Sequence, residues 1–404
     1  MTPRPWPERG RLRYDRPRRR GRSGRASDAT FRVTRPTSLP LIQVLRALAA
    51  VMVAAGHAQF EVAGLAARAG LPFAPAARLP WPAGVDVFFV ISGFIIVHAA
   101  APLYGRADAR KIFLAHRIAR VVPLYWLATT LYLALAFARP GLLGAGSEGP
   151  LYLAASYLFW PMARADGAVQ PLYSLGWTLN YEMAFYALFA LALPWGGGRI
   201  AGGERIASPR RTVLGVVALL GGLVLVGRVA GPLPGPLAAP IAFWSDPIVL
   251  EFACGALLAL ARQEGFRLPA PARLVLAVAG LVLLCVAGEA PALPRALAWG
   301  GPAALLVAAA ALGPAGAVGP RLRPAVVLGD ASYALYLAHP FVVRGLRVTA
   351  ETAGLAAVLG PGPLAASMLV LAAGAAILLH RIVERPLTRA ARALLAPASP
   401  VNKG

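Results

Sequence analysis

The chain has 404 residues, of which 58% are hydrophobic and only 14% are charged. Soluble proteins carry about 25% charged residues, so this composition argues against an ordinary soluble enzyme and favours a multi-pass membrane protein. The net charge of +23 comes almost entirely from arginines between apolar segments, a pattern that the positive-inside rule explains without any nucleic-acid partner.

The first 38 residues contain twelve arginines against three acidic residues, with Pro, Gly and Ser throughout. Such a segment cannot bury a core, so residues 1–38 are predicted to form a disordered tail. Its positive charge is expected to keep it in the cytoplasm and to make the first membrane helix run outward.

Ten apolar segments after residue 40 are predicted to be membrane helices that alternate in direction. This arrangement puts the Arg-rich loops and both termini on the cytoplasmic side. The main exceptions to the positive-inside rule are Arg344 and Arg347, which fall on the outer side. Segment 151–161 is too short to cross the membrane and is predicted to lie at the outer interface. If it were counted as a span, every later Arg-rich loop would fall on the outer side of the membrane, against the positive-inside rule. The expected fold is an all-α transmembrane bundle with spans near 41–60, 84–100, 121–137, 176–195, 212–230, 243–261, 273–288, 296–313, 326–343 and 364–382.

Two polar residues interrupt the first span, Arg46 and His57. Eleven residues at ~100° each return to within about 20° of the same helix face, with a rise of ~16 Å. A cation inside the bilayer usually faces a polar interior, so this stripe is predicted to face a cavity. The alternative is that Arg46 extends to the cytoplasmic head groups and that His57 ends the helix at the far interface.

Arg117 and Arg120 enter the third span from its cytoplasmic end. Residues three apart are neighbours on one helix face, and two guanidinium groups there could bind phosphates. The alternative is an ordinary positive-inside cluster.

A second group of polar and aromatic residues is predicted in the outer half of the membrane. Histidines and carboxylates in such a group suit general base catalysis, although a transporter's proton relay would use the same residue types. Neither cysteine has metal-ligand spacing, so no metal is expected. The group comprises His57, Asp86, Trp177, Asn180, Glu182 and His339.

Five sequence pieces follow one another along the chain, LRALAAVMVAAGH, GVDVFFVISGFII, FLAHRIARVVPLYW, SLGWTLNYEMAFY and LGDASYALYLAHPF. In this order they resemble membrane acyltransferase family 3, the integral-membrane O-acyltransferases that modify bacterial glycans and some small molecules. The resemblance covers roughly residues 39–386, which are expected to form a transmembrane acyltransferase domain followed by a short cytoplasmic tail, residues 387–404. Gln43 departs from the family, in which many members have Asp.

The resemblance implies transfer of an acyl group, most often acetyl, from cytoplasmic acyl-coenzyme A to a hydroxyl of a glycan or glycolipid at the bacterial inner membrane. Arg117 and Arg120 would hold the coenzyme A phosphates, with Arg46 deeper, near the pantetheine or thioester. His57 would be the general base or would briefly carry the acyl group, and Glu182 would orient His57 or the acceptor. The predicted acceptor-binding residues are Asp86, Trp177, Asn180, Tyr336 and His339.

Larger family members append an extracytoplasmic esterase-like domain, for which the short tail of residues 387–404 leaves no room. This chain is therefore expected to act alone or with a separate extracytoplasmic partner. Two other hypotheses stay open at this point. The protein could be a transporter or flippase for lipid-linked saccharides, or a membrane scaffold whose basic tail binds anionic lipids.

Overall fold

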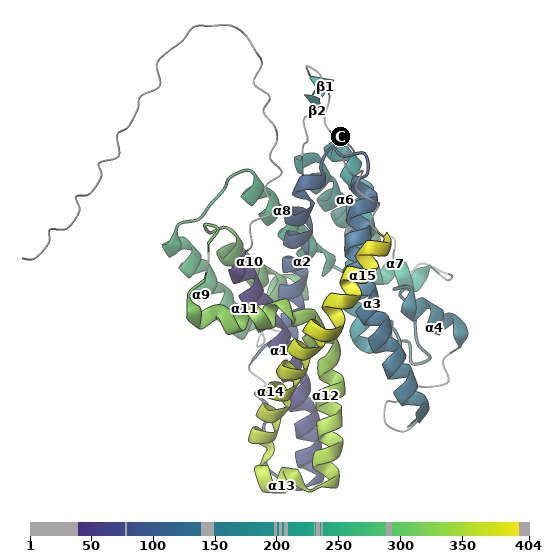
Figure 1. Ribbon diagram of the computed structural model, residues 1–404, viewed down its shortest axis with the longest axis vertical. Coiled ribbons are helices and arrows are strands. Elements are labelled where there is room, and N and C mark those ends of the chain that lie inside the picture. The colour runs from purple at the N-terminus through teal and green to yellow at the C-terminus, as the bar shows by residue number, and fades with distance from the viewer. Residues whose placement is uncertain are drawn as a thin grey trace, which may run out of the picture. The chain divides into compact units, whose positions relative to one another are not determined.

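The chain folds almost entirely into helices in the computed structural model, and its short hairpin consists of β1 (Ile200–Ala201) and β2 (Glu204–Arg205) (Figure 1). The structure describes residues 39–76, 79–138, 149–197, 200–201, 204–205, 209–229, 231, 235, 237–287, 293–316 and 318–395. The predicted tail over residues 1–38 lies outside these ranges. The all-helical prediction is confirmed.

The α-helices are α1 (Pro40–Arg68), α2 (Gly84–Ala100), α3 (Ala109–Ala138), α4 (Pro150–Tyr157), α5 (Trp177–Ala192), α6 (Pro209–Val229), α7 (Ala238–Trp244), α8 (Val249–Gln263), α9 (Ala270–Ala287), α10 (Gly301–Ala311), α11 (Arg323–Asp330), α12 (Ser332–Thr352), α13 (Leu355–Leu359), α14 (Pro361–Leu379) and α15 (Arg385–Leu395). Short 3₁₀ turns are η1 (Trp81–Ala83), η2 (Ala101–Leu103), η3 (Ser174–Gly176), η4 (Leu193–Gly196) and η6 (Pro320–Leu322). Two π-helical turns are η5 (Ala296–Gly300) and η7 (His380–Glu384).

Within the described ranges, six helical segments are long and apolar enough to cross a membrane, or eight if two bent helix pairs each count as one span. The chain is therefore an integral membrane protein. Predicted spans 176–195 and 296–313 correspond to α5 and to η5 with α10, which are shorter. The count of ten spans and the placement of both termini stay predictions. Helix α4 has eight residues, about 12 Å, which agrees with the prediction that segment 151–161 does not cross.

Two predicted spans are bent rather than straight. Span 243–261 overlaps the end of α7 and most of α8, which meet at 42°. Span 326–343 overlaps the end of α11 and the first half of α12, which meet at 70°. The first bend falls at Asp246 and Pro247, because the residue before proline disfavours the helical conformation. The Asp246 carboxylate then accepts a hydrogen bond from the Ile248 amide at 2.8 Å, as in the turn that precedes a helix.

Helix α2 packs closely against α8 at the centre of the bundle. A Cβ atom at Gly93 of α2 would collide with the Phe252 carbonyl, and one at Gly255 of α8 with the Val90 carbonyl. Small residues that allow two backbones to approach are typical of helix contacts in membranes. These two glycines therefore fix the distance between α2 and α8.

Replacing Gly255 with leucine is expected to destabilise the bundle by at least about 1–3 kcal/mol, because backbone atoms of α2 cannot move aside. The measurement is the thermal unfolding temperature in detergent. Gly222→Leu on α6 is the matched control, since a Cβ there meets no atom within 4 Å. Equal unfolding temperatures for the two variants would contradict this view of the α2–α8 contact.

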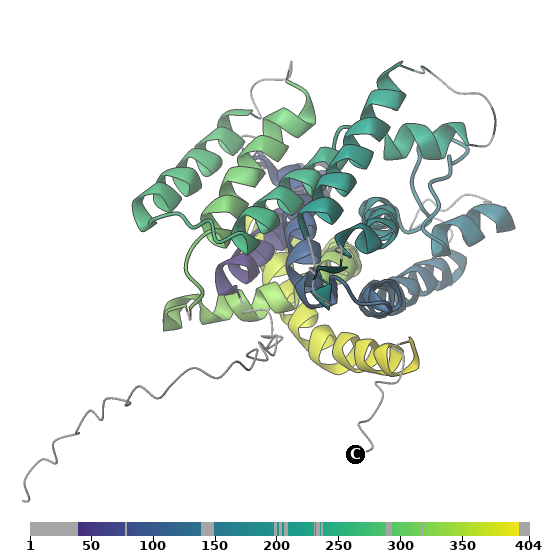
Figure 2. The same cartoon turned by 90° about the horizontal axis from the view of Figure 1, so that it is seen from above.

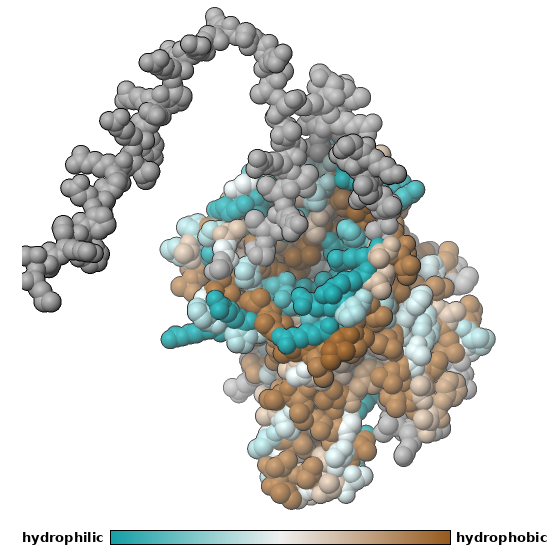
Figure 3. Space-filling view, in the orientation of Figure 1, coloured by the Kyte–Doolittle hydropathy of each residue, from teal (hydrophilic) through white to brown (hydrophobic). Residues whose placement is uncertain are grey.

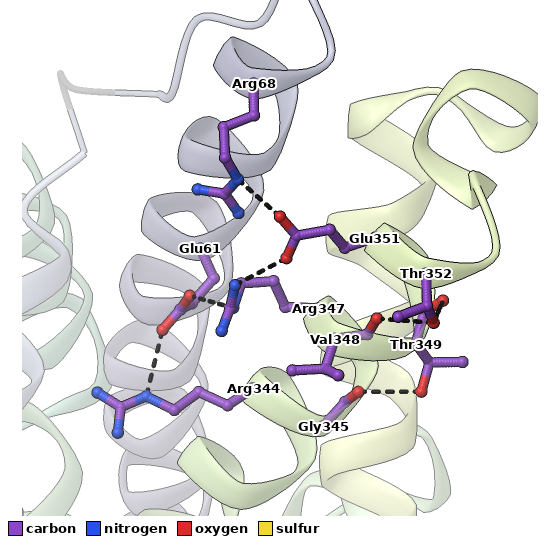
Figure 4. A network of polar contacts seen from close by, with 9 residues as sticks. All are labelled: Glu61, Arg68, Arg344, Gly345, Arg347, Val348, Thr349, Glu351 and Thr352. Atoms are coloured by element: carbon purple, nitrogen blue, oxygen red, sulfur yellow. Dashed lines mark hydrogen bonds and ion pairs between the residues drawn. The ribbon is translucent and has the colours of Figure 1, made fainter. Parts of the chain in front are cut away.

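Helices α1, α12 and α14 pack together, and α13 joins the last two (Figure 1). Near α13, the carboxylates of Glu61 and Glu351 pair with three arginines (Figure 4). Arg347 lies 3.1 Å from Glu61 and 3.0 Å from Glu351, and Arg344 lies 3.3 Å from Glu61. Arg68 contacts Glu351 at 2.8 Å. Local pairing thus explains how Arg344 and Arg347 are accommodated on the predicted outer side.

Candidate functional site

A cavity of about 100 Å³ lies among α1, α2, α3, α5 and α12. Three arginines and one carboxylate line it, together with hydroxyl groups and apolar side chains. The lining residues are Arg46, Val85, Phe88, Phe89, Ile91, Ser92, Ile95, Ile96, Arg117, Arg120, Val121, Thr178, Leu179, Glu182, Tyr186, Ser332, Tyr333 and Tyr336. The structure therefore brings together five of the predicted site residues, Arg46, Arg117, Arg120, Glu182 and Tyr336.

Arg117 is held between aromatic rings. Its guanidinium carbon lies 5.4 Å from the centre of the Phe113 ring and 5.8 Å from that of Tyr186, within the range of cation–π attraction. Its buried Nε atom has no hydrogen-bond partner among the described residues. A buried donor left without a partner is unfavourable, so Arg117 is suited to bind an acceptor from outside the chain.

The described hydrogen bond of Arg46 is with a neutral group. Carboxylates interact with its charge from farther away without forming an ion pair, namely those of Glu182, Asp330 and Glu384. The Nη1 atom of Arg46 lies 3.4 Å from Oε1 of Gln43. Gln43 thus contacts Arg46, but unlike an aspartate at this position it does not neutralise the charge of the guanidinium group. Arg46, Arg117 and Arg120 form no ion pair with any described residue. Positive charge in the cavity is therefore left uncompensated by direct pairing.

Glu182 is fixed by two hydroxyl donors. Ser92 donates to its Oε1 atom at 3.0 Å, and Tyr186 donates to the same oxygen. A carboxylate has about four acceptor sites, so Glu182 keeps capacity for further donors in the cavity. Tyr186 stands four residues after Glu182, the helical spacing that places two side chains on one face, and this spacing could have revealed the pair from the sequence.

His57 of α1 and His339 of α12 form a hydrogen-bonded pair outside the cavity. Nδ1 of His57 lies 2.9 Å from Nε2 of His339, and Nδ1 of His339 lies 3.0 Å from the Leu335 carbonyl oxygen. His339 is fully buried, whereas His57 is exposed. Glu182 is hydrogen-bonded to Ser92 and Tyr186 and not to His57, so its role in orienting His57 or the acceptor stays a prediction.

The two hydrogen bonds of His339 fix the proton positions in the neutral pair. A carbonyl oxygen only accepts, so Nδ1 of His339 carries the hydrogen, and its Nε2 atom is the acceptor. His57 must then donate through Nδ1, which leaves the lone pair of its Nε2 atom free. A histidine held in this tautomer can take a proton from a hydroxyl group.

Tyr336 stands between the cavity and the histidine pair. Its ring lines the cavity, and the centre of the ring is 6.3 Å from that of His339. Its hydroxyl lies 2.9 Å from that of Thr178 and donates to the Leu175 carbonyl at 3.0 Å. These bonds attach α12 to the start of α5. The position of Tyr336 makes it the wall that separates the two groups of polar residues.

Two predicted acceptor-binding residues, Asp86 and Trp177, belong to a second polar cluster. Asp86, fully buried, pairs with Arg295 through contacts of 3.0 and 2.8 Å. The Arg295 guanidinium lies 4.9 Å from the centre of the Trp299 ring and 6.0 Å from that of Trp177. Asn180 is buried and its Oδ1 atom has no partner among the described residues. Asp86, Trp177 and Asn180 therefore do not line the cavity.

Arg295 could not be assigned from the sequence. It directly precedes η5, next to a predicted loop, and no spacing relates it to Asp86, which lies in a distant part of the chain. Only the packing of α10 against α2 brings the two residues together.

Comparisons with known proteins agree with this architecture. The family model of the acyltransferase domain matches residues 40–381. The chain belongs to membrane acyltransferase family 3. It is also 34% identical over 322 residues to the exopolysaccharide production protein ExoZ of Rhizobium meliloti (strain 1021), a match that covers 77% of this chain and 90% of that protein. No solved structure matches the chain.

Membership of this family makes the protein a membrane-embedded acyltransferase. The matched region includes the cavity, the histidine pair and the Asp86–Arg295 cluster. It ends before α15, which begins at Arg385.

Proposed function

We propose that this acyltransferase moves an acyl group, acetyl in the simplest case, from acyl-coenzyme A to a hydroxyl of an exopolysaccharide or of its lipid-linked precursor. The observation that carries the proposal is the cavity, because three arginines without ion-pair partners line it beside the histidine pair. Arginine binds phosphate by two parallel hydrogen bonds, so this cavity suits a donor that carries phosphates. The polysaccharide acceptor is inferred from the relationship to the exopolysaccharide production protein.

In this proposal, the donor enters from the end of the cavity formed by Arg117 and Arg120. Arg46 lies on the neighbouring helix α1 and extends the positive lining of the cavity. Glu182 accepts hydrogen bonds from the donor's amides or from the acceptor. The thioester must then reach the wall formed by Tyr336, because the cavity ends one helical turn before His339.

His57 supplies the base. Its Nε2 atom takes the proton of the acceptor hydroxyl while the hydroxyl oxygen bonds to the thioester carbonyl carbon. The carbon–sulfur bond then breaks and coenzyme A leaves as a thiol after receiving a proton, so the products are an O-acyl ester and free coenzyme A. His57 could instead carry the acyl group briefly on Nε2, which the same tautomer allows.

The test of this function uses purified protein in nanodiscs with acetyl-coenzyme A and exopolysaccharide. Appearance of free thiol that depends on both the protein and the acceptor is the expected result. Absence of both thiol release and donor binding, in protein shown to be folded, would contradict the proposal.

One observation keeps transport as a second candidate. Broken helices near the membrane centre are a common feature of transporters, and α11 and α12 meet at 70° beside the cavity residue Ser332. Transport without chemistry predicts that saccharide accumulates across a vesicle membrane while acyl-coenzyme A is not consumed.

His339 acts in this scheme as a positioning residue for His57. We expect His339→Leu to lower kcat at least about tenfold with little change in the donor KM, because His57 then loses the acceptor that fixes its tautomer. His339→Gln should recover much of the rate, since its amide can accept from His57 and donate to Leu335. Steady-state kinetics of both variants provide the measurement. An equal loss in the two variants, or a change confined to KM, would contradict this role.

A further inference from the structure

Helix α15 carries a stripe of arginines that lies outside the matched family region. Arg385, Arg389 and Arg392 are spaced i, i+4 and i+7, so their side chains share one face of the helix. All three are exposed, whereas Leu387, Thr388 and Ala391 are partly buried. The stripe is therefore available to a ligand while the other face of α15 packs.

The stripe lies beside the helix that carries Arg117 and Arg120. Helix α15 packs along α3, and the two are neighbours in both views (Figures 1 and 2). Arg392 is close enough to Arg120 and His116 of α3 to interact electrostatically with both. Hydrophilic residues form a band over α15 and α11 above an apolar surface (Figure 3). Positive charge thus continues from the cavity on to α15.

No carboxylate in the described part of the chain forms an ion pair with the arginines of this concentration of charge. The three arginines of α15 form no ion pair with a described residue, and the nearby Glu384 is bonded to His380 at 2.7 Å. Like charges placed together repel one another unless an anion binds between them. The arrangement is therefore suited to a ligand with several negative charges.

The size of the cavity indicates where that ligand would lie. Pockets that enclose a drug-sized molecule have volumes of roughly 300–1,000 Å³, whereas this cavity measures about 100 Å³. A cavity of this size does not enclose a whole coenzyme A thioester. A donor whose diphosphate lies at Arg117 and Arg120 must therefore place the rest of its nucleotide end, with the 3′-phosphate, on the surface beside the cavity, where α15 is found.

We propose that Arg385, Arg389 and Arg392 of α15 bind the outer part of the donor's nucleotide end, which carries the 3′-phosphate. This inference rests on the proposed function, since it takes acyl-coenzyme A as the donor. Phosphates of anionic lipids share the same chemistry, so the test distinguishes the two sources.

The test compares two donors in nanodiscs of phosphatidylcholine. The variant replaces all three arginines with glutamine, a residue with good helix propensity. We expect its KM for acetyl-coenzyme A to rise about tenfold or more. Its KM for S-acetyl-N-acetylcysteamine, a thioester without the nucleotide, should stay unchanged. Arg321→Gln with Arg323→Gln, two exposed arginines on η6 and α11, is the control, and both KM values should stay unchanged in it.

Each other outcome has a defined meaning. An unchanged KM for acetyl-coenzyme A, or an equal change for both donors, would overturn the proposal. An effect that appears only in nanodiscs with phosphatidylglycerol would assign the stripe to lipid phosphates and would also overturn it. Wild-type protein that cleaves neither donor would instead contradict the proposed function itself.

Discussion

His57→Ala is expected to abolish measurable acyl transfer, with a loss of about 10²–10⁴ in kcat. Alanine removes the proposed base, whose tautomer is set because His339 accepts the Nδ1 hydrogen of His57 and leaves Nε2 free. The variant should fold, since His57 is exposed and its loss opens no cavity in the core. Thiol release from acetyl-coenzyme A in the presence of acceptor measures the effect.

The matched control for this prediction is His98→Ala, which removes a histidine from α2 that does not line the cavity. Its turnover should remain close to that of the wild type. Normal turnover in His57→Ala, with an unchanged unfolding temperature, would remove His57 from the chemistry and leave the histidine pair as a structural contact between α1 and α12.

The double substitution Arg117→Ala with Arg120→Ala is expected to raise the KM for acyl-coenzyme A at least about 100-fold, since the effects of two losses of ~1.5 kcal/mol or more multiply. Each guanidinium would lose charge-assisted hydrogen bonds to phosphate, and each loss costs about 1.5–3 kcal/mol. The kcat at saturating donor should change much less, because these residues bind the ground state and the transition state alike. Initial rates as a function of donor concentration provide the measurement.

Arg210→Ala with Arg211→Ala is the control for charge and topology. These arginines begin α6 on the same predicted cytoplasmic side, and Arg210 pairs with Glu264 at 3.0 Å. The control should leave the donor KM unchanged. An unchanged KM in the Arg117 and Arg120 variant would reduce that pair to a positive-inside cluster.

Hydropathy was sufficient to predict an all-helical membrane protein, but it could not predict where helices bend. The break between α11 and α12 follows Gly329, whose backbone packs so closely on the Gln43 carbonyl of α1 that a Cβ there would collide with it. That contact joins two segments far apart in the sequence, and no periodicity within residues 326–343 reports it. Span 243–261 did contain a local signal, the proline at position 247.

Only part of the site could be predicted, because contacts between segments far apart in the sequence decide the rest. The positions of Arg46, Arg117, Arg120 and Glu182 in the membrane helices, together with the family motifs, identified residues that line one cavity. The expected depth of each residue in the membrane did not reveal that His57 would pair with His339 rather than approach Glu182.

Pairing depends on which face each helix presents to its neighbours, and this is decided by tertiary packing. The same applies to the pairing of Asp86 with Arg295. The role of Asp86 in binding the acceptor stays a prediction.

Transfer of a radiolabelled acetyl group to polysaccharide tests the central claim most directly. Membrane vesicles with the predicted cytoplasmic face outward would receive labelled acetyl-coenzyme A, and radioactivity would be counted in the isolated polysaccharide. We expect label in the polysaccharide with wild-type protein, its release by mild alkali as expected for an ester, and none above background with His57→Ala. Equal labelling by wild type and His57→Ala, or no labelling by folded wild-type protein with its acceptor present, would contradict the account.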